Sequence, residues 1–327
     1  MPVPYGTVAE IGEAGLLALL RRHLGKPSAG VVAGIGDDAA LLESIGPHAV
    51  LTADLLVERQ DFDFAWATPA DVGHKAAAVN LSDLAAMGAA PRCLLVSLAL
   101  RRRDRVADVL ALIRSLARVG RRYGAPLVGG DLSKTRGPMI VAVTAVGEVA
   151  AGRAMRRGRA RAGDVILVSG TLGGAGLGLM DLRSKRRARS AATRRQLRPE
   201  PRIALGLRLA RWGRVRACAD ISDGLAADAL HLVAPGNGVE IDPALLPIAE
   251  SSRAKLGTRA WRTALCGGED FELAIAVRPG DVAAVKRVAR VAGARLTPVG
   301  TVCRGRGLRL VGFDLGNRRW VGFDHFK

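Results

Sequence analysis

The sequence predicts an α/β fold in two domains, and three observations support this. At 327 residues the chain is longer than a typical single domain. Hydrophobic residues make up 49% and aromatic residues only 4%, so the core is expected to consist of small aliphatic side chains. Short apolar runs of strand type alternate with longer amphipathic segments. We expect a boundary near residue 150, which gives domains at 1–150 and 151–327.

The first half begins with an amphipathic segment, predicted as a helix at 8–24 that closes at Gly25 before Pro27. A strand is expected at 50–57. Thr68, Pro69 and Asp71 form a helix start, with Thr68 as N-cap, and this helix is expected to reach residue 88. The remaining elements expected here are a strand at 93–100, a helix at 106–123, and strands at 126–128 and 139–146.

The second half opens with a predicted strand at 164–169, a glycine-rich turn at 170–178 and a helix. The turn either approaches a phosphate through backbone N–H groups or only permits close helix packing. The basic segment 183–198 is expected as an exposed loop or helix end. Further helices are predicted at 203–212, 223–233 and 280–292, and strands at 240–241, 271–277, 295–299 and 308–311.

Several aspartates occupy positions that secondary structure alone disfavours. Asp54 falls inside an apolar strand, and Asp83 falls in the middle of the predicted helix 68–88. Asp is a poor residue in strand and helix interiors, and a buried, unpaired carboxylate is costly. Other members follow glycines or stand at strand ends: Asp38, Asp131, Asp220 and Asp223. Because Mg²⁺ prefers oxygen ligands and bridges carboxylates to phosphates, the set predicts a nucleotide site with several Mg²⁺ ions.

Most of these aspartates also have a local explanation. Asp38 and Asp131 could be turn or capping residues, and Asp223 could cap the helix that follows it. Asp83 could pair with a single Arg or Lys, and Asp54 could lie on a solvent-facing side of its strand. A single cation site shared by these aspartates is expected over a separate local cause for each of them.

Familiar nucleotide and nucleophile motifs are missing or weak. The sequence contains no GxxxxGK[ST], which excludes a P-loop. Residues 34–39 fit GxGxxA, but two carboxylates within them would repel a pyrophosphate unless a metal intervened. The 5 histidines are scattered without ligand or triad spacing. Covalent nucleophilic catalysis therefore has no support.

The formal net charge of +19 would attract polyanions. However, 42 Arg against 7 Lys fits a GC-rich genome equally well, and no nucleic-acid module accompanies the charge, so no specific nucleic acid is expected. The 4 cysteines form no CxxC pair, which predicts reduced thiols and a cytoplasmic protein. No secretory signal is visible, no apolar stretch is long enough to span a bilayer, and no membrane association is expected.

Six motifs in a fixed order resemble the thiamine-monophosphate kinase family, within the wider superfamily of aminoimidazole-ribotide synthetase. They are GIGDDAALL (34–42), KAAAVNLSDLAAMGAAP (75–91), GGD (129–131), ISDGL (221–225), GGEDFEL (267–273) and GFDHF (322–326). The resemblance implies an aminoimidazole-ribotide synthetase-like fold with mixed sheets and flanking helices. It also implies a homodimer formed through the N-terminal sheet, and direct in-line transfer of the ATP γ-phosphoryl group to thiamine monophosphate.

The resemblance also implies roles for individual residues. Ligands to Mg²⁺ would be Asp38, Thr52, Asp54, Asp83, Asp131, Asp220 and Asp223. Contacts to ATP would come from Gly130, Asp131, Arg157 and Ser222. Glu269 and Phe323 would face the thiamine moiety. The acceptor would already be a phosphate anion, so no catalytic general base would be required. Positioning and charge neutralisation would supply most of the catalysis.

One segment departs from the family pattern. Where the family typically reads VEGVHF, this chain has Arg59 in place of the glycine and Asp61 in place of a substrate-side histidine. Leu132-Ser133-Lys134 also replaces the common Thr-Thr after GGD. Arg59 and Asp61 either contact the acceptor, so that Asp61 joins its binding site, or form a local surface pair. Two alternatives remain: a superfamily member with a different small acceptor, and a non-catalytic polyanion-binding relative.

Overall fold

The structure is a computed structural model that describes residues 6–24, 31–33, 41–42, 46–184 and 190–312. By internal contacts the chain divides into two compact units. The first comprises residues 1–84 and 90–150, and the second comprises 85–89 and 151–327. The predicted α/β class, with mixed sheets and flanking helices, is confirmed.

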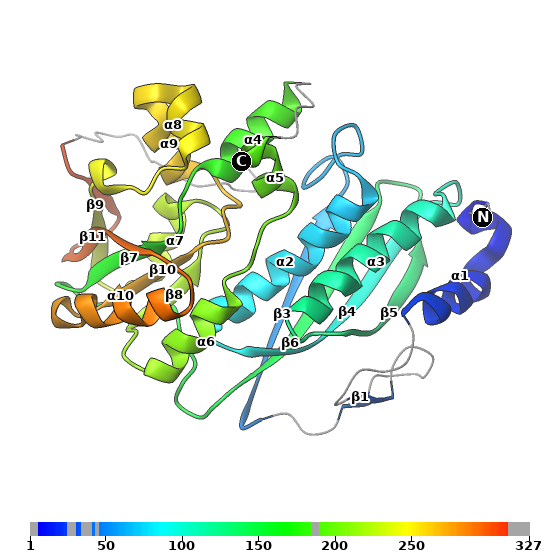
Figure 1. The fold of residues 1–327 in the computed structure, drawn as a ribbon, viewed down its shortest axis with the longest axis horizontal. Helices are drawn as coiled ribbons and strands as arrows, with labels where there is room; N and C mark the ends of the chain where they lie inside the picture. The colour runs from blue at the N-terminus through cyan, green and yellow to red at the C-terminus, as the bar shows by residue number, and fades with distance from the viewer. Residues whose placement is uncertain (1–5, 25–30, 34–40, 43–45, 185–189, 313–327) are drawn as a thin grey trace. The chain divides into compact units, whose positions relative to one another are not determined.

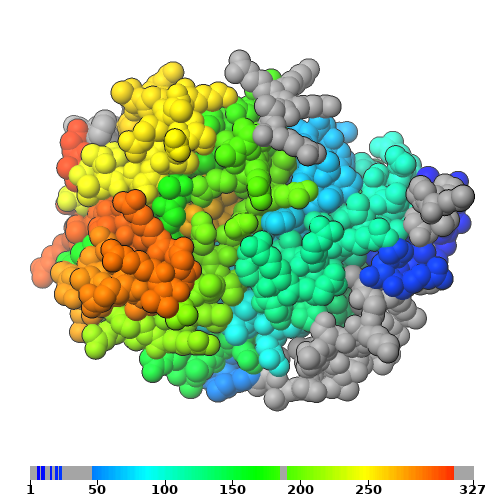
Figure 2. All heavy atoms as spheres, in the orientation of Figure 1, coloured from blue at the N-terminus to red at the C-terminus, as the bar shows by residue number. Residues whose placement is uncertain are grey.

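The first unit is built on a four-stranded mixed sheet with the order β3-β6-β4-β5. Only β4 and β5 run parallel. Two helices, α2 and α3, lie over one face of this sheet (Figure 1), and in the space-filling view their side chains close over it (Figure 2). The elements are α1 (Val8–Leu24), β1 (Val31–Ala33), β2 (Leu41–Leu42), β3 (His48–Val57), α2 (Pro69–Met87), β4 (Ala90–Leu100), α3 (Val106–Arg122), β5 (Leu127–Lys134) and β6 (Ile140–Val149).

The start of α2 follows the predicted capping pattern. The Thr68 hydroxyl accepts the N–H of Asp71 at 3.2 Å, and the Asp71 carboxylate accepts the N–H of Thr68 at 3.0 Å. This reciprocal pair satisfies N–H groups that the first turn of a helix otherwise leaves without partners. The predicted helix start at Thr68 is therefore confirmed.

The alternation of side chains along β3 gives the sheet two different faces. Thr52, Asp54 and Leu56 point to the helix-covered face, and Leu56 is only 6% exposed. Leu51 and Leu55 point to the opposite, open face and are 67% and 54% exposed. Because β3 lies at the edge of the sheet, this apolar face extends to its margin.

The second unit is built on a six-stranded sheet with the order β12-β9-β11-β7-β10-β8, in which only β12 and β9 run parallel. A core of small aliphatic side chains packs on it, as composition predicted. Its strands are β7 (Val165–Ser169), β8 (Ala217–Asp220), β9 (Asn237–Ile241), β10 (Leu273–Val277), β11 (Leu296–Arg304) and β12 (Leu308–Leu310). Its α-helices are α4 (Gly174–Arg183), α5 (Ala191–Leu197), α6 (Ile203–Trp212), α7 (Leu225–His231), α8 (Glu250–Leu256), α9 (Ala260–Cys266) and α10 (Val282–Val291).

The structure corrects several predicted element bounds. Strand β5 continues to Lys134, so Gly129, Gly130 and Asp131 lie inside a strand and not after its end. Helix α4 begins at Gly174, within the glycine-rich segment expected as a turn. The segment expected as an exposed loop contains α5, and α8 and α9 were not predicted. Across the parts of the chain that the structure describes, no helix has the length and apolarity to cross a membrane.

Candidate functional site

The first group of predicted ligands lies where β3 faces α2. The Thr52 hydroxyl donates a hydrogen bond to Asp83 Oδ2 at 2.5 Å. Asn80, fully buried on the same helix, accepts the N–H of Asp54 at 3.1 Å through Oδ1. Its Nδ2 donates to the carbonyl of Ala76 at 3.0 Å, which fixes the orientation of the amide. Thr52, Asp54 and Asp83 are thus brought together by one strand and one helix.

The carboxylates of Asp54 and Asp83 repel each other. Burial raises the pKa of Asp54 to about 6, and the charge of Asp83 adds to the effect. Asp54 also lies on the helix-covered side of β3, which excludes the solvent-facing explanation for its place in the strand. Two close carboxylates and a hydroxyl oxygen form a hard-oxygen donor set, and a divalent cation would relieve the repulsion.

Gly130 and Asp131 lie elsewhere on the same sheet. A Cβ at Gly130 would stand 1.8 Å from the carbonyl oxygen of Val96, so this position requires glycine. Asp131 is exposed and pairs with Ser97 in a row that ends at Leu55, which places it on the open face. It is three strands from β3, roughly 14 Å along the sheet. Asp131 therefore does not lie beside Asp54 and Asp83, and its role as a shared ligand stays a prediction.

The departing segment forms a tight turn after β3. Arg59 has a φ of 72°, so it adopts the left-handed conformation that glycine adopts easily, at the position where the family pattern has glycine. The Asp61 carboxylate accepts the N–H of Val57 at 2.8 Å, and the N–H of Asp61 donates to the carbonyl of Val57 at 2.9 Å. One carboxylate oxygen of Asp61 thus holds the turn. Its predicted contact with an acceptor is untested.

The second group lies in the second unit, where two loops are joined by backbone hydrogen bonds. The N–H of Glu269 donates to the carbonyl of Ser222 at 2.7 Å, and the N–H of Phe271 donates to that of Ile221 at 2.9 Å. Gly268 permits this approach, since a Cβ there would stand 2.4 Å from Ser222 O. Ser222 and Glu269, predicted separately for ATP and for the acceptor, therefore lie next to each other, with Asp223 following Ser222.

Carboxylates also gather at the start of α7. Asp228, buried at 1% exposure, accepts the N–H of Asp223 at 3.0 Å. Burial raises the pKa of Asp228 to about 7, and the charges of Asp220 and Asp223 contribute. Arg157 is 3.6 Å from Asp220, so these two predicted residues also meet. The N-cap of α7 is Gly224, without a side-chain cap, so Asp223 does not cap this helix.

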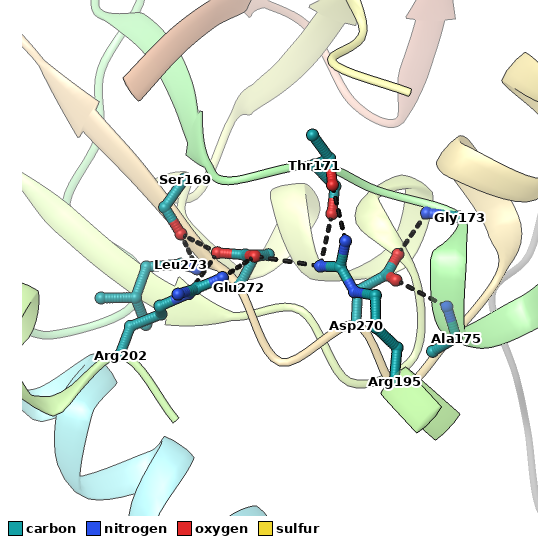
Figure 3. A network of polar contacts seen from close by, with 9 residues as sticks. All are labelled: Ser169, Thr171, Gly173, Ala175, Arg195, Arg202, Asp270, Glu272 and Leu273. Atoms are coloured by element: carbon teal, nitrogen blue, oxygen red, sulfur yellow. Dashed lines mark hydrogen bonds and ion pairs between the residues drawn. The ribbon is translucent and has the colours of Figure 1, made fainter. Parts of the chain in front are cut away.

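The glycine-rich turn is already occupied by a side chain of the protein. Asp270 accepts the N–H of Gly173 at 2.5 Å and the N–H of Ala175 at 3.0 Å, at the beginning of α4 (Figure 3). Burial raises the pKa of Asp270 to about 6 despite these hydrogen bonds. Because an internal carboxylate takes these N–H groups, the phosphate-binding interpretation of this turn is disfavoured, and the close-packing alternative remains.

A buried ion-pair network lies beside this turn. Glu272 is fully buried, accepts the hydroxyl of Ser169 at 2.5 Å, and pairs with Arg195 at 3.1 Å. Arg202 donates to both carboxylate oxygens of Glu272, one of these bonds being 2.7 Å (Figure 3). Arg195 also donates to the hydroxyl and the carbonyl of Thr171, at 2.6 and 2.8 Å. Arg195, which belongs to the basic segment 183–198, therefore forms its contacts within the second unit.

Sequence reasoning missed these supporting residues. Asp270 and Glu272 stand in the motif GGEDFEL, so a carboxylate count along the motif could have found them. Asp228 carried the same signal as Asp83, a carboxylate among apolar helix residues.

Asp38 and Phe323 lie outside the described residues. Among the residues that are described, no group of three or more His, Cys, Asp or Glu side chains is placed to hold a metal ion.

Comparisons with known proteins cover nearly the whole chain. Residues 36–149 match the family model described as AIR synthase related protein, N-terminal domain, and residues 161–312 match the corresponding C-terminal domain. The chain is 36% identical to the thiamine-monophosphate kinase of Escherichia coli (strain K12) over 330 residues, covering 96% of this chain and 98% of that relative.

Solved structures show the same similarity. The thiamine-monophosphate kinase from Stenotrophomonas maltophilia K279a superposes with a TM-score of 0.82 at 34% identity, covering 92% of this chain and 97% of that one. A structure described as AaThiL complexed with AMPPCP and TMP gives a TM-score of 0.75 at 33% identity, with 96% and 98% covered. These similarities extend through both units.

Proposed function

We propose, from the premise that this chain belongs to the thiamine-monophosphate kinase family, that it is a kinase that transfers the γ-phosphoryl group of ATP to thiamine monophosphate. The observation that carries the proposal is the meeting of Ser222 and Glu269, which the family pattern assigns to ATP and to the acceptor. Two separate loops bring them together by main-chain hydrogen bonds. This arrangement would hold the two phosphorylated substrates next to each other.

We propose Mg²⁺ as the accompanying cation. In the first unit Thr52, Asp54 and Asp83 would hold it, and the raised pKa of Asp54 supports this because burial, together with the charge of Asp83, disfavours its ionised form. In the second unit Asp220 and Asp223 would do so, supported by the raised pKa of the adjacent Asp228. Asp38 would join the Mg²⁺ ligands, whereas Asp131, on the open face of the first sheet, would contribute apart from Thr52, Asp54 and Asp83. When bound, Mg²⁺ would neutralise charge between the phosphate groups.

The protein's own groups would act mainly by placement. Arg157, half exposed beside Asp220, would pair with a phosphate of ATP, and Gly130 would let the nucleotide approach the backbone of β5. Glu269, Phe323 and Asp61 would face the acceptor. Since the attacking oxygen belongs to a phosphate that is already an anion, no side chain would need to remove a proton from it.

We further propose that the protein is a homodimer formed through the open face of the first sheet. Leu51 and Leu55 are more than half exposed there. An exposed apolar face on an edge strand is a typical protein interface, and a second copy would cover it with the same residues.

The four cysteines are all free, which supports a cytoplasmic location.

The proposal is tested by incubating purified protein with ATP, Mg²⁺ and thiamine monophosphate and quantifying thiamine diphosphate. We expect turnover that a chelator abolishes and that Ca²⁺ restores poorly, because Mg²⁺ demands tighter octahedral geometry. The variant Asp83→Asn should lose at least about 100-fold in kcat, on the scale of removing one electrostatic contact to a transition state. Its fold, followed by circular dichroism, should be retained.

The matched control is Asp108→Asn, an aspartate in the first turn of α3 outside every motif, which should keep its activity. Full activity of Asp83→Asn would remove the metal assignment. If the wild type binds Mg²⁺ and ATP but does not phosphorylate thiamine monophosphate, the departure at Arg59 and Asp61 reflects a different small acceptor, and the proposed substrate is wrong.

A further inference from the structure

The loop that carries Glu269 has an unusual backbone. Among the described residues three non-glycine positions have a positive φ, and two of them are Glu269 at 67° and Phe271 at 48°. L-residues adopt this region rarely, and such strain persists only where the surroundings impose it. Two strained residues in one tripeptide indicate that the direction of the Glu269 side chain is imposed by the fold.

The two neighbouring carboxylates of this loop hold its backbone in place. Asp270 is bound to the N–H groups at the start of α4, and Glu272 is bound to Arg195 and Arg202 (Figure 3). Both are buried. Glu269 differs, because it is half-buried and its backbone is joined to Ser222. Of the three carboxylates, it is therefore the one placed next to the candidate site.

The carboxylate of Glu269 is contacted by Gln196, whose Nε2 donates a hydrogen bond to Oε2. A carboxylate only accepts hydrogen bonds, so this contact sets the amide orientation and directs Gln196 Oε1 away from Glu269. Gln196 is 1% exposed, and within the described part of the chain its Oε1 has no hydrogen-bond partner. A buried amide oxygen without a partner destabilises a fold, and a residue that carries one calls for an explanation.

We propose that Gln196 is a positioning residue for the acceptor, which holds the Glu269 carboxylate in the direction needed to meet the cationic or amino groups of a thiamine-type substrate. The inference rests on the proposed function. Helix α5 supplies the precision, because Arg195, the preceding residue, is anchored to Glu272 and Thr171. The main chain of α5 is thereby fixed next to the loop, and Gln196 transmits that position to Glu269.

The test is the variant Gln196→Met, which keeps the volume of the side chain and removes both the donor and the oxygen without a partner. We expect the KM for thiamine monophosphate to rise roughly tenfold, with the KM for ATP unchanged within twofold. We expect the midpoint of thermal unfolding to stay equal or to rise. In a Glu269→Ala background, Gln196→Met should have no additional effect on the KM, since it acts through Glu269.

The control is Arg194→Met, an exposed residue of the same helix, which should leave both KM values unchanged. Equal KM values in Gln196→Met and wild type would overturn the inference while leaving the kinase function intact. A lowered unfolding midpoint with both KM values raised would also overturn it, because Gln196 would then be structural. A wild type that does not turn over thiamine monophosphate would instead refute the proposed function, and the inference with it.

Discussion

At the scale of single residues, the buried carboxylates fall into two kinds according to their surroundings. Asp270 and Glu272 meet N–H groups and guanidinium groups of the second unit, which offset their charges in part, since burial still raises the pKa of Asp270 to about 6. Burial raises the pKa of Asp54 and of Asp228, and the other carboxylates that they face add to the effect. Carboxylates of the first kind join loops through hydrogen bonds and ion pairs, whereas those of the second kind are the groups that a cation would bind.

The raised pKa of Asp270 predicts a pH dependence of stability. Its value of about 6 in the folded protein lies above the ordinary 3.8, so the folded state binds this proton more tightly than the unfolded state does. Stability from this group is full below pH 4 and is lost as the pH rises towards 6. The loss amounts to about 3 kcal/mol, at about 1.4 kcal/mol per pKa unit.

The variant Asp270→Asn measures this effect by urea unfolding between pH 4 and pH 7. Asn cannot accept both N–H groups of Gly173 and Ala175, so the variant should be less stable by an amount that does not depend on pH. In addition, the difference in free energy of unfolding should change in favour of the variant as the pH rises from 4 to 6, because only wild type loses stability as Asp270 ionises. Parallel pH profiles for the two proteins would show that Asp270 does not titrate in this range.

Residue roles were predictable from the sequence where a single position violated local preference. Asp54 and Asp83 stood out in this way, and the structure places them together. The partners of Asp270 and Gln196 were not predictable, because Gly173 and Glu269 lie 97 and 73 positions away along the chain. No local pattern records such a meeting, since it depends on how strands of the second sheet are ordered.

At the scale of elements, the helices α4 and α5 pack together, and α5 contacts the loop that carries Glu269 through Gln196. Gly178 lies on α4 where α5 crosses it, and a Cβ there would stand 2.2 Å from the carbonyl oxygen of Ala192. We expect Gly178→Ala to push α5 away and to destabilise the protein by about 1–3 kcal/mol, as overpacked contacts do. Because α5 carries Gln196, the KM for thiamine monophosphate should rise as well.

The matched control is Gly280→Ala. Nothing lies within 4 Å of a Cβ at Gly280, so this substitution should be neutral. Chemical denaturation and steady-state kinetics on both variants test the prediction. A stable Gly178→Ala with wild-type kinetics would mean that α4 and α5 can separate without moving the loop at Glu269.

Long periodic elements were predictable, and short ones were not. The bounds of α1 and α6 agree with the predicted helices at 8–24 and 203–212, since each carries enough apolar residues for a helical period to be visible. Helix α5 has only 7 residues and a basic sequence. It depends on a capping box between Ser190 and Thr193 and on the ion pair of Arg195 with Glu272, and the second of these exists only in the folded unit.

At the scale of the whole molecule, the open face of the first sheet leads to a test of assembly. We expect wild type to be a dimer by size-exclusion chromatography with light scattering. Leu51→Glu should weaken the dimer at least tenfold, because it would place two like charges in an apolar symmetric contact. The control Leu245→Glu alters a leucine that is 50% exposed in the second unit, and it should leave the mass unchanged.

A monomeric wild type would contradict the proposed interface, and so would a Leu51→Glu variant of unchanged mass.

The family and the α/β class were both predictable from the sequence, because ordered motifs and alternating elements extend over nearly the whole chain. The open face itself was implied only by the resemblance. Leucines at 51 and 55 look like core residues in a sequence, and only the structure reveals that α2 and α3 cover the other side.

The three carboxylates at positions 269, 270 and 272 show protein engineers which positions to vary and which to keep. Two are bound into the scaffold and one is directed by a neighbouring amide, so positions 196 and 269 can be randomised together while 270 and 272 are kept. A library of this kind would search for new acceptors without loosening the loop that presents them. Variation at 195 would be a poor choice, since it would remove the anchor from which both randomised positions take their geometry.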